Sequence, residues 1–237
     1  MKVGIMQPYF FPYIGYISLI KHTDRFILFD GVQFIRHGWI ERNRVLKPGE
    51  GWQYIAVPLV KHSRETLIKD VLIRNNEDWK AKLLAQLEHY KKRSPFYKDV
   101  IDVIRQGIDI ETDSITKLNQ STLQAVCDYL GIPFKSEIFS EMDIKIEPVT
   151  APDEWALNIC KAMRYEEYWN PPGGMDFFNR QKYEDAGVTL RFQKVAVTPY
   201  SQRRGPDRIE TGLSIIDVMM FNPVEKIHEM LDDYELL

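Results

Sequence analysis

The chain has 237 residues, 44% of them apolar and 27% charged, and a formal net charge of −3. These values are typical of a globular protein of one or two domains, and they give no general positive field for nucleic acid. No apolar run approaches the roughly 18 residues of a membrane span, and the sequence begins without the pattern of a signal peptide. The two cysteines, Cys127 and Cys160, fit no zinc spacing, so we expect reduced thiols, a cytoplasmic protein and no metal site.

The first thirty residues predict a β-α-β unit. Apolar runs over 2–5 and 25–30 predict two buried strands, and the apolar positions 17, 19 and 20 predict a helix between them. The connection from the first strand to this helix is the aromatic segment MQPYFFPYIGY over 6–16. Because ligands of open α/β sheets bind where strand carboxyl ends meet such loops, we expect a ligand at this segment.

The remaining elements follow in chain order. Strands are predicted over 41–46, 54–60 and 69–73, and helices over 77–93, 95–104 and 114–130, the last capped by Asp113 or Ser114 and ended by Gly131. A strand over 134–139, a loop over 141–152, a helix over 153–163, a loop over 169–174 and a helix over 175–186 come next. A strand over 188–192, a polar loop over 198–211, an apolar run over 213–220 and a terminal helix from 223 complete the chain.

These elements predict an α/β fold with an N-terminal Rossmann-like β-α-β unit, a largely helical middle region and a return to the sheet near the C-terminus. The predicted division places the ligand-binding sheet in 1–75 with 187–222, the mainly helical region in 76–186 and a terminal helix in 223–237. One compact domain is the alternative.

The segment Tyr13-Ile14-Gly15-Tyr16 has the spacing of His-x-Gly-His, a motif of nucleotidylyltransferases, pantothenate synthetases and class I tRNA synthetases. In those enzymes the histidines and the glycine contact ATP. Tyrosine can bond to a phosphate but carries no positive charge at neutral pH. Tyr13 and Tyr16 are therefore either part of an altered nucleotide site or aromatic residues packed on a helix face.

Two polar side chains follow the first two predicted strands. Gln7 precedes Pro8, which holds it extended, so its amide should project near the strand's carboxyl end. Asp30 ends the second strand. We predict that both belong to the floor of a site, with Asp30 as a general base, a cation ligand or a hydroxyl acceptor. The alternative for Asp30 is a turn residue before Gly31.

Basic residues gather in two segments, which contain Arg36, Arg42 and Arg44 and, later, Arg203, Arg204 and Arg208. Each group is either a solvated surface or an anion site, since arginine presents a planar fork of donors. Strand alternation places Arg42 and Arg44 on one face and Asn43 on the other. An inward Asn43 needs hydrogen-bond partners, and a ligand is one candidate.

Three further positions are candidates for a ligand site. Gly173 and Gly174 follow two prolines and give a backbone that a ligand can approach closely, although they also suit a simple turn. Asp217 lies inside an apolar run, so its carboxylate is either a paired buried group or a functional one.

Taken together, these segments resemble the WbqC-like family. The resemblance lies in residues 6–16, 29–34 and 38–46, in His89-Tyr90 with Tyr97, in Gly173-Gly174 and in 213–217. It implies a role in the synthesis of O-antigen or another bacterial surface polysaccharide, because members look like proteins encoded among genes for that pathway. It also implies a site whose core is Gln7, Tyr9, Asp30, Gln33, Trp39, Arg42 and Asn43.

From this resemblance and the β-α-β unit we expect a transferase or ligase that adds an acyl or aminoacyl group to an amino sugar or nucleotide-sugar. The expected catalytic residues are Asp30, Gln7 and Asn43. The expected substrate-binding residues are Tyr9, Tyr16, Gln33, Trp39, Arg42, Arg44, Gly173, Gly174 and Asp217. The candidate co-substrates are a nucleotide such as ATP or an acyl donor, and the sequence does not decide the oligomeric state. The alternatives are a nucleotidylyltransferase-like enzyme and a non-catalytic binding protein of the same pathway.

Overall fold

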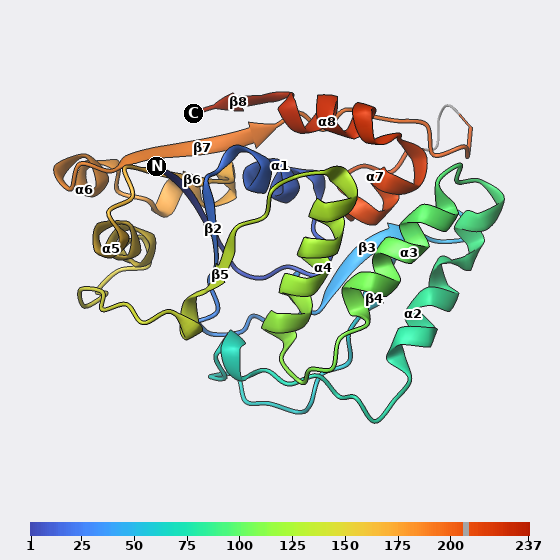
Figure 1. Ribbon diagram of the computed structural model, residues 1–237, viewed down its shortest axis with the longest axis horizontal. Helices are drawn as coiled ribbons and strands as arrows, with labels where there is room; N and C mark the ends of the chain where they lie inside the picture. The colour runs from blue at the N-terminus through green and yellow to red at the C-terminus, as the bar shows by residue number, and fades with distance from the viewer. Residues whose placement is uncertain (206–208) are drawn as a thin grey trace.

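A six-stranded sheet forms the centre of the computed structural model, which describes residues 1–205 and 209–237 (Figure 1). Its order is β5-β2-β1-β6-β7-β8. The strands are β1 (Lys2–Met6), β2 (Arg25–Leu28), β5 (Ser136–Ile138), β6 (Glu167–Asn170), β7 (Thr189–Val195) and β8 (Tyr234–Leu236). Neighbours pair in parallel except that β8 runs antiparallel to β7. The predicted α/β fold, with its N-terminal β-α-β unit, is confirmed.

Helices cover both faces of this sheet. They are α1 (Ile14–His22), α2 (Trp79–Leu87), α3 (Tyr97–Ile108), α4 (Ile115–Leu130), α5 (Glu154–Met163), α6 (Arg180–Asp185), α7 (Ile215–Phe221) and α8 (Val224–Asp232). Short 3₁₀ turns are η1 (Ile68–Asp70), η2 (Glu88–Lys92), η3 (Phe139–Glu141) and η4 (Pro172–Phe177). Helices α5 and α6 lie on one side of the sheet, and the other helices lie on the opposite side (Figure 1).

Strand alternation divides the core between these two faces. Val3 and Ile5 of β1, with Ile27 of β2, pack in the smaller cluster with α5 and α6. Phe26 and Leu28 of β2 point the other way, into the larger cluster formed with the remaining helices. A strand with both faces covered is apolar along most of its length, which explains the continuous apolar runs at the start of the sequence.

A hairpin separate from the main sheet is formed by β3 (Arg42–Leu46) and β4 (Trp52–Ala56). The alternation predicted for β3 is confirmed, because Asn43 is buried while Arg42 and Arg44 are partly exposed. The helix signals of α4 are confirmed as well. Ser114 caps its first turn by accepting a hydrogen bond from the Lys117 amide at 3.3 Å, and Gly131 ends it with φ of +67°.

Several predicted elements were wrong. Residues 69–73 form no strand, because Ile68–Asp70 turns as η1 and Leu72 and Ile73 make only isolated bridges. The predicted helix over 175–186 is divided into η4 and α6, which Asn179 caps. The predicted loop over 169–174 overlaps the end of β6, a strand of four residues that was not predicted and that two prolines follow directly. The closing strand β8 was not predicted.

The predicted division into regions stays a prediction. Two strands of the sheet, β5 and β6, come from within 76–186. The larger core cluster contains residues from 10 to 231. In the described part of the chain, no helix is long and apolar enough to cross a membrane.

Candidate functional site

A cavity of about 740 Å³ opens at the carboxyl ends of β2, β1 and β6, on the face that α5 covers. Here the order of the sheet reverses, since the chain passes from β1 to β2 on one side and reaches β6 on the other side much later. Such switch points are the usual ligand sites of open α/β sheets. The lining residues are Ile5, Met6, Gln7, Tyr9, Tyr13, Phe29, Ile35, Trp39, Pro152, Trp155, Ala156, Tyr168, Asn170, Pro171, Pro172, Gly173, Gly174, Phe177 and Phe178.

The lining is aromatic and uncharged. Among the described residues it contains no aspartate, glutamate, lysine, arginine or histidine. Burial raises the pKa of Tyr9 above its usual value and raises that of Tyr13 to about 12, so both phenols are neutral at physiological pH. The amide side chains of the lining are Gln7, which directly follows β1, and Asn170, the last residue of the neighbouring parallel strand β6. This combination suits an uncharged ring that carries hydroxyl or amide groups.

Buried polar side chains fix the aromatic segment that forms one wall of this cavity. The Asn119 amide donates to the carbonyls of Pro8 at 2.7 Å and Ile40 at 2.9 Å. The Asn43 amide donates to the carbonyls of Phe10 at 3.1 Å and Phe11 at 3.0 Å. These bonds satisfy carbonyls that a buried loop would otherwise leave unpaired.

The same wall contains a residue in a strained backbone conformation. Phe11 has φ of +38°, which is uncommon for a residue other than glycine. The Ser214 hydroxyl donates to the Phe11 carbonyl at 2.6 Å, and the Ile215 amide donates to the Pro12 carbonyl at 2.7 Å. The start of α7, far along the chain, therefore holds the loop in place.

The structure brings five of the predicted site residues together in the cavity. These residues are Gln7, Tyr9, Trp39, Gly173 and Gly174. They come from three segments: the loop after β1, the loop after β2, and η4 after β6. The other predicted site residues do not line the cavity.

Tyr16 is fully buried beneath the aromatic loop. Its hydroxyl donates to the Gln7 carbonyl at 2.9 Å, and its ring lies 5.5 Å from that of Tyr9. Tyr13 covers Gly15, because a Cβ built on that glycine would lie 2.4 Å from Cε2 of the tyrosine ring. The surface that the glycine of His-x-Gly-His offers to a nucleotide is therefore occupied here by the protein's own side chain.

Asp30 lies just beyond β2 but turns away from the cavity. Only 1% of its surface is exposed, and its two oxygens accept hydrogen bonds from the amide (2.9 Å) and the hydroxyl (2.7 Å) of Ser140. Gln33 is also engaged in protein contacts, because its side-chain amide donates to the Arg64 carbonyl. Both residues connect the loop after β2 to neighbouring segments.

In the Arg42-Asn43-Arg44 strand, both arginines contact aromatic rings and backbone carbonyls. Arg42 stacks on Tyr54 and donates to the His37 carbonyl at 2.7 Å. Arg44 lies between Trp39 and Trp52, with its guanidinium carbon 5.4 and 5.2 Å from the two ring centres. It also donates to the Gly212 carbonyl at 2.8 Å.

Arg204 of the second basic segment donates to the backbone carbonyls of Lys47 and Gly51. Burial and the neighbouring Arg93 lower its pKa. Arg203 is exposed, and Arg208 lies outside the described residues. Arg204 therefore stabilises the turn of the β3-β4 hairpin.

Asp217 is completely buried in α7, away from the cavity. It accepts hydrogen bonds from Tyr90 and Tyr200, both at 2.6 Å, and from Gln202 at 2.9 Å. Burial raises its pKa to about 6, although the three donors and Arg204 oppose this shift. It is a paired buried carboxylate, which is one of the two alternatives that the sequence left open.

Sequence reasoning missed several side chains that line the cavity. They are Phe29, Trp155, Tyr168, Asn170, Phe177 and Phe178. Phe29 and Trp155 pack with their ring centres 5.3 Å apart, and Phe177 stacks on Phe178 at 4.4 Å. Asn170 could have been found from the pair of prolines that follows it, had β6 been identified as a strand.

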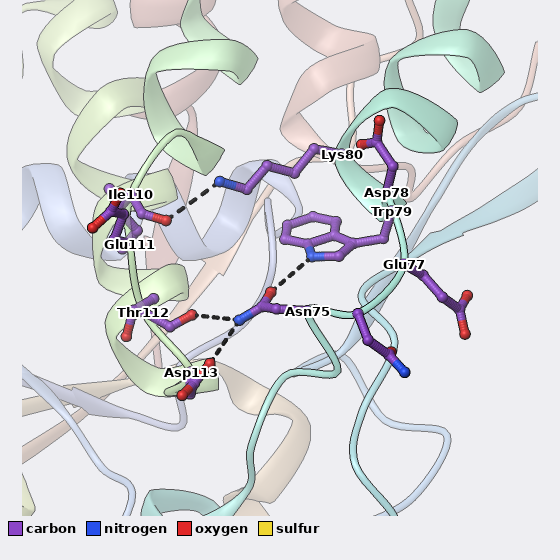
Figure 2. A pocket seen from close by; sticks show the side chains of 10 residues that line it. Asn75, Glu77, Asp78, Trp79, Lys80, Ile110, Glu111, Thr112 and Asp113 are labelled. Atoms are coloured by element: carbon purple, nitrogen blue, oxygen red, sulfur yellow. Dashed lines mark hydrogen bonds between the residues drawn. The ribbon is translucent and has the colours of Figure 1, made fainter.

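A second depression is open and polar, and it lies between the start of α2 and the loop before α4 (Figure 2). Hydrogen bonds cross this depression: the Asn75 amide donates to Asp113 at 2.8 Å, its oxygen accepts from the Trp79 indole at 3.1 Å, and Lys80 donates to the Ile110 carbonyl at 3.3 Å (Figure 2). This arrangement joins two helical segments. In the part of the chain that is described, no three histidine, cysteine, aspartate or glutamate side chains are grouped as metal ligands.

Comparison with known proteins gives two matches. The WbqC-like protein family matches residues 7–229. The chain is also similar to the uncharacterized protein Rv1507c of Mycobacterium tuberculosis, at 27% identity over 224 residues that cover 93% of each chain. No solved structure matches. Because the family match runs from the cavity's first loop into α8, the chain belongs to the WbqC-like protein family.

Proposed function

We propose that this WbqC-like protein is an enzyme of bacterial surface-polysaccharide synthesis that acts on an amino sugar held in the cavity at the switch point. The observation that carries the proposal is the lining itself, which is rich in aromatic rings and, among the residues described, includes no ionisable acid or base such as aspartate, lysine or histidine. Pyranose rings bind proteins by laying their C–H faces on aromatic rings. The family's association with surface polysaccharide supports the choice of a sugar over other uncharged rings.

The two amide side chains give the cavity its polar specificity. Gln7 and Asn170 lie at the carboxyl ends of the neighbouring strands β1 and β6, so their amides can donate to and accept from hydroxyl groups on one edge of a ring. Gly173 and Gly174 border the same space, and Gly173 has no heavy atom within 4 Å of a built Cβ. A substrate can therefore approach the backbone closely on this side.

The reaction that we propose is transfer of an acyl or aminoacyl group to the sugar amine. The sugar nitrogen forms a bond to the donor's carbonyl carbon, the bond from that carbon to the leaving group breaks, and the amine proton goes to the leaving group. The cavity contributes position and exclusion of water rather than a charged catalyst. Asp30 was predicted as a general base, but its carboxylate bonds to Ser140 outside the cavity lining, so the proposed step does not pass the proton through it, and the turnover of an Asp30→Asn variant tests this.

Thermal-shift measurement with glucosamine, N-acetylglucosamine and their nucleotide-linked forms tests the proposed ligand. Binding to the folded state alone raises the melting temperature. We expect Trp155→Ala and Gln7→Ala to abolish the shift, while Trp52→Ala keeps it, because Trp52 is a partly exposed tryptophan outside the cavity. A wild-type protein that no sugar shifts would contradict the proposal.

A non-catalytic sugar-binding protein of the same pathway is the second candidate. It is favoured by the absence of any acidic, basic or histidine side chain from the described lining, since proton transfer usually needs one. Incubation of the protein with an amino sugar and acyl donors, followed by mass spectrometry, distinguishes the two candidates. A new N-acylated sugar supports the enzyme, and binding without any product supports the binding protein.

A further inference from the structure

The mouth of the cavity exposes apolar side chains from two segments. Ile35 is 63% exposed, Phe177 54% and Trp39 36%, although all three line the cavity. Met175, also 36% exposed, lies in η4 with Phe177. We call these four residues the apolar rim. Exposed apolar residues grouped around one opening mark an interaction surface, whereas single exposed residues do not.

Cations lie beside the Ile35 side of the apolar rim. Segments 33–36 and 62–67 are joined by hydrogen bonds from the Phe34 amide to the Thr66 carbonyl at 2.9 Å and from the Arg36 guanidinium to the His62 carbonyl at 2.7 Å. The exposed charged residues of these segments and their immediate neighbours are Arg36, Lys61, Arg64 and Glu65. The local charge is therefore positive in a protein whose net charge is −3.

We propose that the apolar rim and these cations dock on an anionic bilayer surface, where the cavity takes a sugar carried by a membrane lipid. The inference rests on the proposed function and adds the form in which the substrate is presented. Apolar side chains that enter the acyl boundary beside cations that meet the headgroup phosphates are the arrangement of peripheral membrane sites. Since the described lining residues include no cation, we place the phosphate of such a lipid outside the cavity, next to Arg36 and its neighbours.

Cosedimentation with sucrose-loaded vesicles tests the inference. We expect the full-length chain to bind vesicles of equal phosphatidylglycerol and phosphatidylcholine, and to bind pure phosphatidylcholine much more weakly. A Lys61→Gln, Arg64→Gln double variant is expected to partition about 25-fold more weakly, since each cation near the surface contributes roughly fivefold. Neither side chain lines the cavity, so this variant keeps the sugar-induced thermal shift of the wild type.

The apolar contribution is tested by Ile35→Ser and Phe177→Ser, each expected to weaken vesicle binding about tenfold or more. The matched control is Val197→Ser, because Val197 is 57% exposed and does not line the cavity. Failure of the wild type to bind anionic vesicles overturns the inference, as does an equal effect of all three serine variants. Vesicle binding without any sugar-induced shift supports the docking surface and contradicts the sugar site on which the proposed function depends.

Discussion

Replacing Asn43 by alanine should destabilise the fold strongly, because this one side chain serves three backbone groups. It is 4% exposed, donates to the carbonyls of Phe10 and Phe11, and accepts from the Arg44 amide at 2.8 Å. The Phe11 carbonyl keeps a second partner in Ser214. Two buried groups, the Phe10 carbonyl and the Arg44 amide, would lose this partner at about 1–3 kcal/mol each, so we expect a loss of about 3–4 kcal/mol.

Urea unfolding followed by tryptophan fluorescence measures this loss. An Asn43→Asp variant keeps the shape but sets a carboxylate oxygen against two carbonyls, so its loss of stability relative to the wild type should be larger at pH 7 than at pH 4, where the protonated group donates again. Asn76→Ala, an exposed asparagine, is the control and should change stability by less than about 0.5 kcal/mol. A cost below about 1 kcal/mol for Asn43→Ala would refute the assigned role.

Three further outcomes are expected. Gly15→Ala should cost about 1–3 kcal/mol in urea unfolding, because its Cβ would meet the Tyr13 ring, whereas Gly49→Ala, with no heavy atom within 4 Å of a built Cβ, should be nearly neutral. The pKa of Asp217 is higher in the folded than in the unfolded state, so the folded protein binds this proton more tightly. The free energy of unfolding should therefore fall by about 3 kcal/mol as pH rises from about 4 to about 6, because each unit of pKa difference contributes about 1.4 kcal/mol. An Asp217→Asn variant should lack this slope. Asp30→Asn should fold with a loss of about 1 kcal/mol, and a loss above about 3 kcal/mol would contradict its described contacts.

The N-terminal unit could be predicted because its strands are continuous apolar runs with helical spacing between them. The same reasoning placed Gln7 at the carboxyl end of β1, where the structure has it. Strand alternation correctly placed Asn43 on the face opposite Arg42 and Arg44, yet it could not identify the loop carbonyls to which its amide donates. Asp30 lies one residue past Phe29, which faces the cavity, so it turns to the other side and meets η3.

The rest of the site could not be read from local patterns. Trp155, Phe177 and Phe178 are apolar residues of ordinary helices and turns, and nothing nearby in the sequence distinguishes a ring that lines a cavity from one that fills a core. Asn170 depended on recognising β6, whose four residues are too few for periodicity to detect. Only the strand order, set by long-range pairing, brings these residues beside the first loop.

The central place of β1 also has a consequence for synthesis of the chain. β1 pairs with β2 almost at once, but its other neighbour, β6, begins only at Glu167. During synthesis on the ribosome, the backbone groups along one edge of β1 therefore stay unpaired until β6 has been made. Such edges invite pairing with other chains, so truncated products that end before β6 should aggregate and depend on chaperones.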